Sequence, residues 1–250
     1  MLAGVVALSA CDKDAVQITS ITAPITGARV KFFNFGLNAP GVNFYAGNNK
    51  VTAISSTTGI ESTNGVAFGA VATGNLYTAL PAGQVTFAGK IAAIVDKDLT
   101  VSTVPATLVD GKAYSVYLSG FYDATTKQVE GFVVEDAFAD AYDFTQAQVR
   151  FVNASPNSTP MQLFLRNATT LVESPAGNAV AYKAGGAFVG VPTGGYDLNT
   201  RTVGSGVNAI TRTAISFLAG RVYTITARGD MTIVSTTLAN RPFLDNSLNR

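Results

Sequence analysis

The stretch Ala28-Arg29-Val30-Lys31-Phe32-Phe33-Asn34 returns later in the chain as Ala147-Gln148-Val149-Arg150-Phe151-Val152-Asn153. Both copies show the two-residue alternation of a β-strand with one buried face. Each copy is followed, at the same distance along the chain, by a second block that alternates in the same way. These blocks are Val42-Asn43-Phe44-Tyr45 and Met161-Gln162-Leu163-Phe164. Turn-forming residues separate the two blocks of each copy. The sequence therefore predicts that one plan of strands and turns occurs twice.

Two further pairs of matching blocks follow in the same order. Residues 80–87 correspond to residues 191–198, and in both a Pro followed by Gly favours a turn that leads into a strand. Residues 110–117 correspond to residues 219–226. The spacing between copies shrinks along the chain, so the first copy is expected to have the longer loops, within residues 46–76. Short strand-like blocks with turn signals between them are typical of β-sandwiches.

These blocks resemble the bacterial family called domain of unknown function 4397. Its pattern has a strand of the type Val-Arg-Phe-Val-Asn-Ala-Ser-Pro, a short apolar strand, a Val-Pro-x-Gly-x-Tyr turn and a strand of the type Gly-x-x-Tyr-Thr-Ile-Thr. Residues 149–229 carry all four pieces. The first copy departs from the pattern with Phe35-Gly36-Leu37 in place of Ala-Ser-Pro, and Gln162 stands where the family usually has Asp. The resemblance implies an immunoglobulin-like sandwich in an exported, often lipid-anchored protein, and it implies no activity.

The composition sets limits on function. The chain has 250 residues, of which 47% are hydrophobic and 13% charged, enough apolar material for sizeable cores. The net charge of +1 provides no basic field for nucleic acid, so no nucleic-acid partner is expected. The chain has no His, which excludes Ser-His-Asp and Cys-His catalysis and nearly all zinc and haem sites. We expect no cofactor, no metal and no catalytic residue.

The N-terminus indicates a lipoprotein. An apolar run ends in Leu8-Ser9-Ala10-Cys11, which resembles the lipobox in which small residues precede a Cys that receives the lipid. The run is too short to span a membrane and suits a signal peptide, although no Lys or Arg precedes it. Cys11 is the predicted lipidation site, and the membrane the predicted partner through that lipid. The charged Asp12-Lys13-Asp14 that follows resembles tags that route lipoproteins to the cell surface.

We therefore predict an all-β protein with two tandem immunoglobulin-like β-sandwich domains behind a lipoprotein signal and a tether. The expected boundaries are a signal peptide at 1–10, a lipidated tether at 11–27, domain 1 at 28–138, a linker at 139–146 and domain 2 at 147–250. Residues 134–143, which straddle the end of domain 1, are predicted to form either a short helix or extended linker.

Two groups of side chains are weighed as possible sites. The densest group of acids lies between the domains and is interpreted as a solvated connector rather than a calcium site; its members are Glu130, Glu135, Asp136, Asp140 and Asp143. Three aromatic residues are candidates for exposed rings that stack on a ligand: Tyr117, Phe121 and Tyr122. The other strand aromatics are expected in the core: Phe32, Phe33, Phe44, Tyr45, Tyr114, Phe151, Tyr196 and Tyr223.

The favoured function is that of a non-enzymatic lipoprotein of the cell envelope, a binding, structural or adhesin-like module whose ligand the sequence does not name. We expect it at the outer membrane, with its body either in the periplasm or at the cell surface. The alternative is a surface protein that binds or processes carbohydrate, which a cleft holding two carboxylates with raised pKa values would favour. An extracellular glycan and a protein both stay open as partners.

Overall fold

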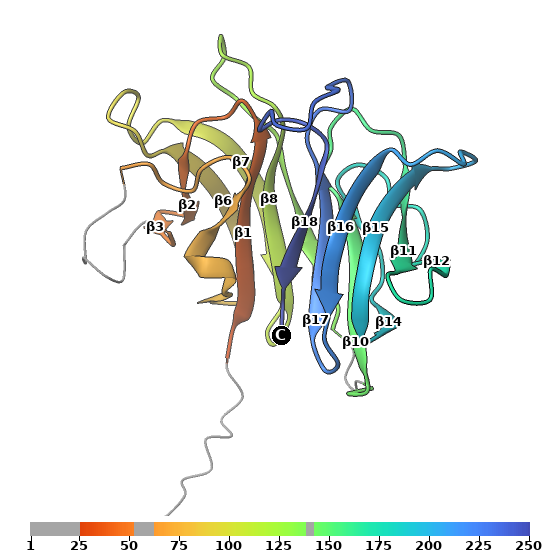
Figure 1. The fold of residues 1–250 in the computed structure, drawn as a ribbon. Coiled ribbons are helices and arrows are strands. Elements are labelled where there is room, and N and C mark those ends of the chain that lie inside the picture. The colour runs from red at the N-terminus through yellow and green to blue at the C-terminus, as the bar shows by residue number, and fades with distance from the viewer. Residues whose placement is uncertain (1–25, 53–62, 139–142) are drawn as a thin grey trace, which may run out of the picture.

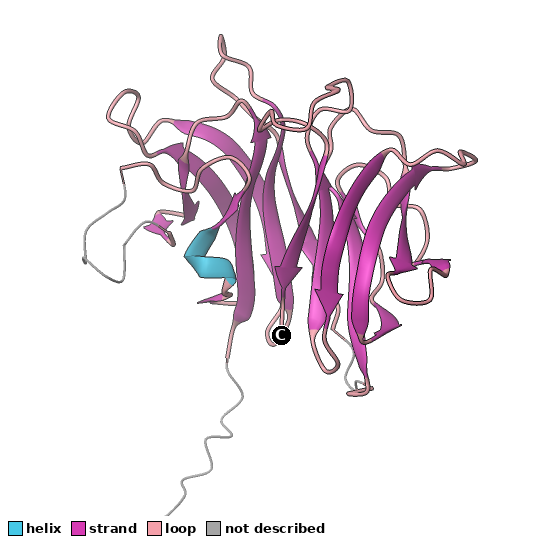
Figure 2. Cartoon of the chain, in the orientation of Figure 1, coloured by secondary structure: helices cyan, strands magenta, loops and turns pink. Residues whose placement is uncertain are grey.

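The computed structural model describes residues 26–52, 63–138 and 143–250. Cys11, the predicted signal peptide and nearly all of the predicted tether lie outside the described residues. Within them the regular secondary structure consists of strands, apart from a short 3₁₀ turn at Ala72–Asn75 (Figure 2). The strands form four sheets arranged as two sandwiches that stand side by side (Figure 1).

Domain 1 is built from two sheets. The first has the strand order β4-β1-β8-β9, with β5 also paired to β1: β4 (Ala70–Val71), β1 (Ala28–Leu37), β8 (Ala113–Phe121), β9 (Gly131–Glu135) and β5 (Thr78–Leu80). The second has the order β3-β2-β6-β7: β3 (Asn49–Lys50), β2 (Val42–Ala46), β6 (Gly83–Ile91) and β7 (Thr100–Leu108).

Domain 2 repeats this plan strand for strand. Its first sheet has the order β13-β10-β17-β18, with β14 also paired to β10: β13 (Ala184–Gly185), β10 (Gln146–Asn153), β17 (Val222–Arg228), β18 (Phe243–Leu248) and β14 (Val189–Pro192). Its second has the order β12-β11-β15-β16: β12 (Glu173–Pro175), β11 (Met161–Asn167), β15 (Gly194–Thr202) and β16 (Ile210–Phe217).

The repeated plan confirms the predicted duplication and fold class. In each domain the first strand pairs in parallel with the strand that holds the last matching block, residues 110–117 or 219–226: β1 pairs with β8, and β10 with β17. All other strand pairs described in the four sheets are antiparallel. A parallel pair needs a long connection, and here the whole second sheet of each sandwich supplies it.

Each sandwich closes its own apolar core. In domain 1 the core includes Phe32, Phe44 and Phe87, whose rings pack with centroids 5.1 and 5.5 Å apart around Phe32. In domain 2 the corresponding core includes Phe151, Leu163 and Phe217. All eight strand aromatics that the sequence assigned to the core are buried, which confirms that expectation. Burial of a large apolar side chain contributes roughly 1.5–3 kcal/mol, so the rings that belong to the two cores stabilise each domain separately, whereas Phe33 is buried between the domains.

Strands β1 and β10, which the alternation predicted to be half-buried, are buried on both faces, so that expectation is wrong for them; β8 is buried on both faces as well. One face of β1 points into the domain core, and the alternate residues Lys31, Phe33 and Phe35 are buried as well. The same holds for β8, where Ser115, Tyr117 and Ser119 alternate with core residues. The outer face of this sheet is covered by domain 2.

The helix considered for residues 134–143 is absent from the part of that range that the structure describes. Val134 and Glu135 end strand β9, residues 136–138 have no regular structure, and residues 139–142 lie outside the described residues. Strand β10 begins at Gln146, which the sequence placed at the end of the linker. The predicted long middle loops of domain 1 contain the short strands β3 and β4, and residues 53–62 lie outside the described residues.

Both domains carry the same tyrosine corner, in which a Tyr hydroxyl holds the turn before its own strand. The hydroxyl of Tyr114 accepts a hydrogen bond from the Val109 N–H at 3.1 Å, and that of Tyr223 accepts one from the Leu218 N–H at 3.2 Å. Such corners are a hallmark of immunoglobulin-like sandwiches. The agreement of both distances and both sequence separations shows that the duplication extends to side-chain detail.

Candidate functional site

The two sandwiches meet through their first sheets, and aromatic rings fill the middle of the contact. Domain 1 contributes the stacked rings of Phe33, Tyr117 and Phe132, whose centroids lie 4.5 Å and 4.9 Å from that of Tyr117. Domain 2 presents the small buried side chains of Val152 and Ala154 to them. Large rings on one side and small side chains on the other allow the sheets to approach closely without voids.

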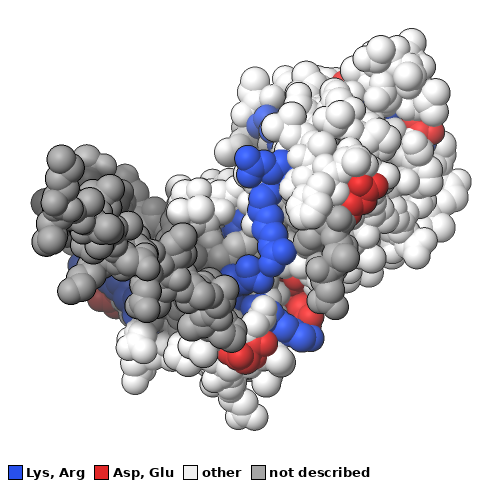
Figure 3. Space-filling view, turned by 90° about the horizontal axis from the view of Figure 1, so that it is seen from below, with Lys and Arg blue, Asp and Glu red and all other residues white. Residues whose placement is uncertain are grey.

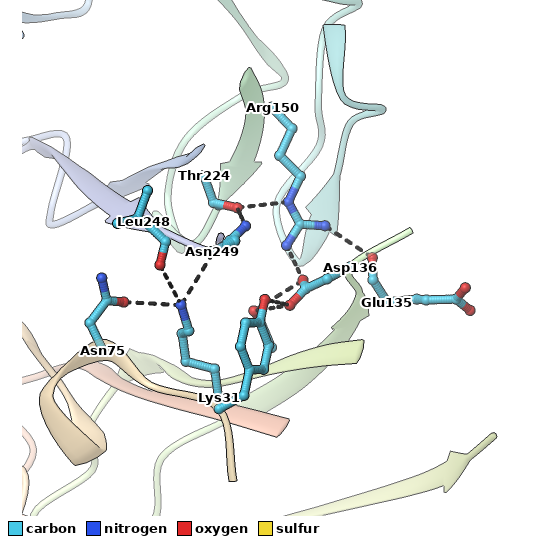
Figure 4. Close-up of polar contacts among 10 residues, drawn as sticks. Lys31, Asn75, Glu135, Asp136, Arg150, Thr224, Leu248 and Asn249 are labelled. Atoms are coloured by element: carbon cyan, nitrogen blue, oxygen red, sulfur yellow. Dashed lines mark hydrogen bonds and ion pairs between the residues drawn. The ribbon is translucent and has the colours of Figure 1, made fainter. Parts of the chain in front are cut away.

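Arg150, on strand β10 of domain 2, crosses this junction to the end of strand β9 of domain 1 (Figure 4). Its guanidinium donates a hydrogen bond to the Glu135 carbonyl at 2.9 Å and forms an ion pair with the Asp136 carboxylate. Its Nε atom donates to the Thr224 hydroxyl at 2.9 Å. Both side chains of the ion pair are buried, with exposed fractions of 1% and 0%.

Lys31, on strand β1 of domain 1, crosses in the opposite direction to the end of strand β18 (Figure 4). Its Nζ atom donates to the Leu248 carbonyl at 2.8 Å and to Asn249 Oδ1 at 3.3 Å. A third bond, at 3.1 Å, goes to Asn75 Oδ1 of its own domain. The three acceptors are uncharged oxygens, and among the described residues no carboxylate lies at hydrogen-bond distance from this buried cation.

These two crossings are equivalent under the internal repeat. Lys31 and Arg150 occupy the same position in the two copies of the first strand. Each contacts the last carbonyl of the partner domain's final strand and the side chain of the next residue. Each also lies over an aromatic ring of its own domain: Lys31 Nζ is 4.4 Å from the Tyr77 ring centroid and Arg150 Cζ is 4.8 Å from that of Phe188. The junction therefore has approximate twofold symmetry.

Asp136 is the central acceptor of this network. Besides Arg150 it accepts hydrogen bonds from the hydroxyls of Tyr77 and Ser115. Burial raises the pKa of Tyr77, and the neighbouring Asp136 carboxylate raises it further, so Tyr77 stays a hydrogen-bond donor. A buried charge costs several kcal/mol unless it is paired and hydrogen-bonded, and here both oxygens of the carboxylate have partners.

Burial lowers the pKa of Lys31, whereas it raises that of Tyr77. Loss of hydration lowers the pKa of Lys31 to about 8, because a buried ammonium with neutral partners is less stable than one in water. The Asp136 carboxylate raises this pKa and the Arg150 guanidinium lowers it, both as smaller effects. Of the two equivalent cations, Lys31 is therefore the one that can lose its charge near neutral pH.

A pocket of about 370 Å³ opens beside this network, at the end of the molecule where strand β1 begins. Its charged lining residues are three cations, Arg29, Lys112 and Arg250, and two acids, Glu135 and Asp136, of which Asp136 pairs with Arg150. The guanidinium carbons of Arg29 and Arg250 lie 5.8 and 4.6 Å from the ring centroid of Phe138, which also lines the pocket. Lys112 forms an ion pair with Glu135 at 2.8 Å. The pocket therefore has more cationic than anionic groups and suits an anionic ligand better than a cation.

The structure separates the three aromatic residues proposed to stack on a ligand. Tyr117 is completely buried in the interdomain junction, so its assignment as an exposed ring is wrong. Tyr122 packs against the core of domain 1. Phe121 is 48% exposed. Tyr117 follows the alternation of β8 toward the outer face, and that face is covered by the second domain, which the alternation within one strand cannot reveal.

The acidic group does not converge on one place either, and its interpretation as a solvated connector is wrong for Asp136, which is buried. Glu135 pairs with Lys112, Glu130 pairs with Lys183 at 2.9 Å, and Asp143 accepts a hydrogen bond from the Thr145 N–H at 2.9 Å. Asp140 lies outside the described residues. No group of three or more Asp, Glu or Cys in the described ranges is arranged to hold a metal ion.

Sequence reasoning missed Lys31 and Arg150, the two residues that define the junction. A signal for them was present: both copies of the first strand carry a cation at the same position, on the face opposite the core residues. A long cationic side chain recurring at one place in two otherwise divergent copies is expected where the repeats contact one another. The residues it reaches, at the ends of the last strands, have no comparable signal.

Comparison of the sequence with protein-family models gives one match for each of the two domains. A comparison with curated proteins finds no match. No helix of the described residues is long and apolar enough to span a membrane. The family model described as domain of unknown function (DUF4397) matches twice, over residues 28–164 and 147–249. Together with the repeated strand plan, these matches show that the chain belongs to the DUF4397 family and carries two copies of its domain.

Proposed function

We propose that the protein is a non-enzymatic lipoprotein of the bacterial cell envelope, anchored through an acylated Cys11, whose two sandwiches act as one rigid binding or structural module. The observation that carries the proposal is the reciprocal crossing of Lys31 and Arg150, which ties the domains together at both halves of the junction. A body held in this way presents its loops in fixed relative positions, as scaffold and adhesin-like modules do.

The proposal that the protein is not an enzyme is supported by the hydrogen bonds that occupy the polar groups between the domains. The carboxylate of Asp136 is engaged by Arg150, Ser115 and Tyr77, so none of its oxygens is left to act as an acid or base on a ligand. A general acid or base has to reach the reacting atom of its substrate within about 3 Å. The network is therefore better suited to fixing a geometry than to turnover.

The anchor is tested by fractionating cells that express the wild type or Cys11→Ser, with membranes washed at high ionic strength. The thioether bond to the lipid requires the Cys thiol, so the substitution is expected to move the protein from the washed membranes to the soluble fraction. Ser9→Ala, which keeps a small residue before the Cys, is the matched control and should stay with the membranes. Retention of the Cys11→Ser protein after the wash contradicts the lipoprotein proposal.

The alternative of a carbohydrate-binding or carbohydrate-processing protein has less support, because the proposed stacking surface loses Tyr117 to the junction. Binding of the purified body to a glycan array, lost in Phe121→Ala, would favour that alternative. The corresponding control is Phe144→Ala, another exposed ring at the opposite end of the strands.

A further inference from the structure

Two turns of identical construction lie at the end of the molecule where strand β1 begins. They are residues 109–112 in domain 1 and residues 218–221 in domain 2, and we call them the corner turns. In each, the N–H of the fourth residue donates to the carbonyl of the first at 3.2 Å, from Lys112 to Val109 and from Arg221 to Leu218. The tyrosine corner holds the N–H of the first residue in both.

Each corner turn is also fixed to the first strand of its domain. The N–H of Gly111 donates to the Gly27 carbonyl at 2.9 Å, and that of Gly220 donates to the Gln146 carbonyl at 2.8 Å. Both glycines have positive φ angles, 76° and 72°, which favour glycine over residues with a Cβ. The corner turns are therefore rigid, and the approximate twofold symmetry sets them side by side at one end of the molecule.

The side chains of the corner turns combine an exposed aliphatic group with a cation. Val109 and Leu218 are 47% and 57% exposed, and Lys112 and Arg221 end the two turns. The ring of Phe144, 75% exposed, lies beside Gly220. Exposed aliphatic and aromatic groups flanked by Lys or Arg are the combination with which amphipathic helices enter the headgroup region of a bilayer, and the corner turns present the same kinds of group.

Charge at this end favours an anionic partner. Figure 3 looks at this end and shows Lys and Arg side chains in a band across it, between the domains. The band is consistent with the pocket lined by Arg29, Lys112 and Arg250. Among the described acids here, Glu135 pairs with Lys112, whereas Asp110 and Asp143 accept hydrogen bonds from the neutral N–H groups of Gly27 and Thr145, which do not cancel a carboxylate's charge. These three acids are outnumbered by the cations at this end, which are Arg29, Lys112, Arg221 and Arg250.

We propose that this end of the folded body rests on an anionic bilayer surface, with both corner turns and Phe144 in the headgroup region and the cations against lipid phosphates. This inference rests on the proposed anchor at Cys11, because the tether enters the body at Gly27 and thus at this same end. Attachment at this end leaves the corner turns closer than the opposite loops to the point where the tether joins the body, so they can reach the membrane without the body turning over. Membrane contact would then fix the orientation of the body as well as its location.

The test uses the full chain with Cys11→Ser, so that no lipid contributes, and measures co-sedimentation with vesicles. Binding is expected to vesicles of phosphatidylcholine mixed with phosphatidylglycerol, to weaken as salt is added, and to be absent with phosphatidylcholine alone. Each cation near an anionic surface is worth about fivefold in affinity. Leu218→Ser combined with Arg221→Gln is therefore expected to weaken binding by at least about fivefold.

The matched control changes the opposite end of the molecule. Val95 and Lys97 are both exposed in the loop between β6 and β7, so Val95→Ser combined with Lys97→Gln removes the same kinds of group. This variant should bind the mixed vesicles like the parent. Circular dichroism of both variants should match the parent, because the backbone bonds of the corner turn do not need the replaced side chains.

Three results would overturn the proposal: no sedimentation with phosphatidylglycerol vesicles, equal loss in the two variants, or binding to the polyanion dextran sulfate without binding to vesicles. The last would identify an acidic polysaccharide as the partner of this end. Failure here is distinguishable from failure of the anchor, because the vesicle assay contains no lipidated protein. Conversely, the high-salt wash in the anchor test removes contact through the corner turns and leaves the lipid as the only attachment.

Discussion

The Arg150 crossing and the Lys31 crossing of the junction share one plan and differ in their acceptors. Both cations start from the same position of the repeat and reach the last carbonyl of the partner domain. At the Arg150 crossing the next side chain is the Asp136 carboxylate, whereas at the Lys31 crossing it is the Asn249 amide. A further amide, from Asn75, completes the Lys31 crossing.

The type of cation matches the acceptor at each crossing. A guanidinium keeps its charge at any accessible pH, so a countercharge beside it offsets much of the cost of its burial, and Asp136 provides one. An ammonium can release its proton, and neutral acceptors suffice for Lys31, whose pKa burial lowers to about 8. The two copies of the domain therefore differ on both sides of their contact in a matched way. The permanently charged Arg150 lies beside a carboxylate, and the titratable Lys31 lies beside amides.

Removal of the carboxylate should have the largest effect on stability. Asp136→Ala leaves the Arg150 guanidinium buried without a countercharge and also frees the hydroxyls of Tyr77 and Ser115. Loss of one partner from a buried ion pair costs about 3–5 kcal/mol. Chemical denaturation followed by circular dichroism should show the free energy of unfolding reduced by about that amount.

The neighbouring acid provides the control for this substitution. Glu135 pairs with Lys112 at the surface, where both side chains are more than a third exposed. Exposed pairs contribute about 0–1 kcal/mol, so Glu135→Ala should change stability little. Equal effects of the two substitutions would show that the Arg150 crossing does not hold the domains together.

The Lys31 crossing should make stability depend on pH. In the folded protein Lys31 loses its proton near pH 8, whereas in the unfolded chain it keeps the proton up to the ordinary value of 10.5. Between these values the unfolded state binds more protons, so the free energy of unfolding rises with pH. A rise of about 1–2 kcal/mol is expected from pH 8 to about 9.5. Above about pH 10 tyrosines oppose it, since burial raises the pKa of Tyr117 to about 12 and the unfolded tyrosine loses its proton first.

Two variants sharpen this prediction when unfolding is measured at a series of pH values. Lys31→Met removes the titrating group, so the rise above pH 8 should disappear. Asn249→Asp gives the Lys31 crossing the carboxylate that the Arg150 crossing has, which should raise the Lys31 pKa and also flatten the profile. A rise that persists unchanged in both variants would assign the pH dependence to other groups.

The duplicated strands could be predicted because each domain has to close its own core. Alternation along Ala28–Asn34 and Ala147–Asn153 marks the residues that face that core, and Phe32 and Phe151 lie where it places them. This information is local to one strand and its neighbours in the same sandwich. It is the reason why the fold class and the repeat agree with the structure.

The junction could not be predicted in the same way. Alternation shows which side chains point away from the core of their own domain, but it does not show what covers those side chains. Lys31 and Tyr117 point away from their own core, as residues at a solvated face do, and both are buried by the other domain. Asp136 lies among acids that are mostly exposed, and only its distance to Arg150 distinguishes it. Contacts between repeats depend on how two finished domains approach, which the pattern within one domain leaves undetermined.

The smallest expected effects come from the tyrosine corners, which test how similar the two domains are away from the junction. Tyr114→Phe and Tyr223→Phe each remove one hydrogen bond, from the N–H of Val109 and of Leu218 respectively. A bond of this kind contributes about 0.5–1.5 kcal/mol, and both turns have the same geometry, so denaturation should show two nearly equal losses. Tyr45→Phe, whose hydroxyl bonds Asp98 at 3.2 Å in an exposed loop, should cost less. Clearly unequal losses would mean that the hydrogen bond of one corner turn contributes more to the free energy of unfolding than that of the other. The two turns would then share a geometry without contributing equally to stability.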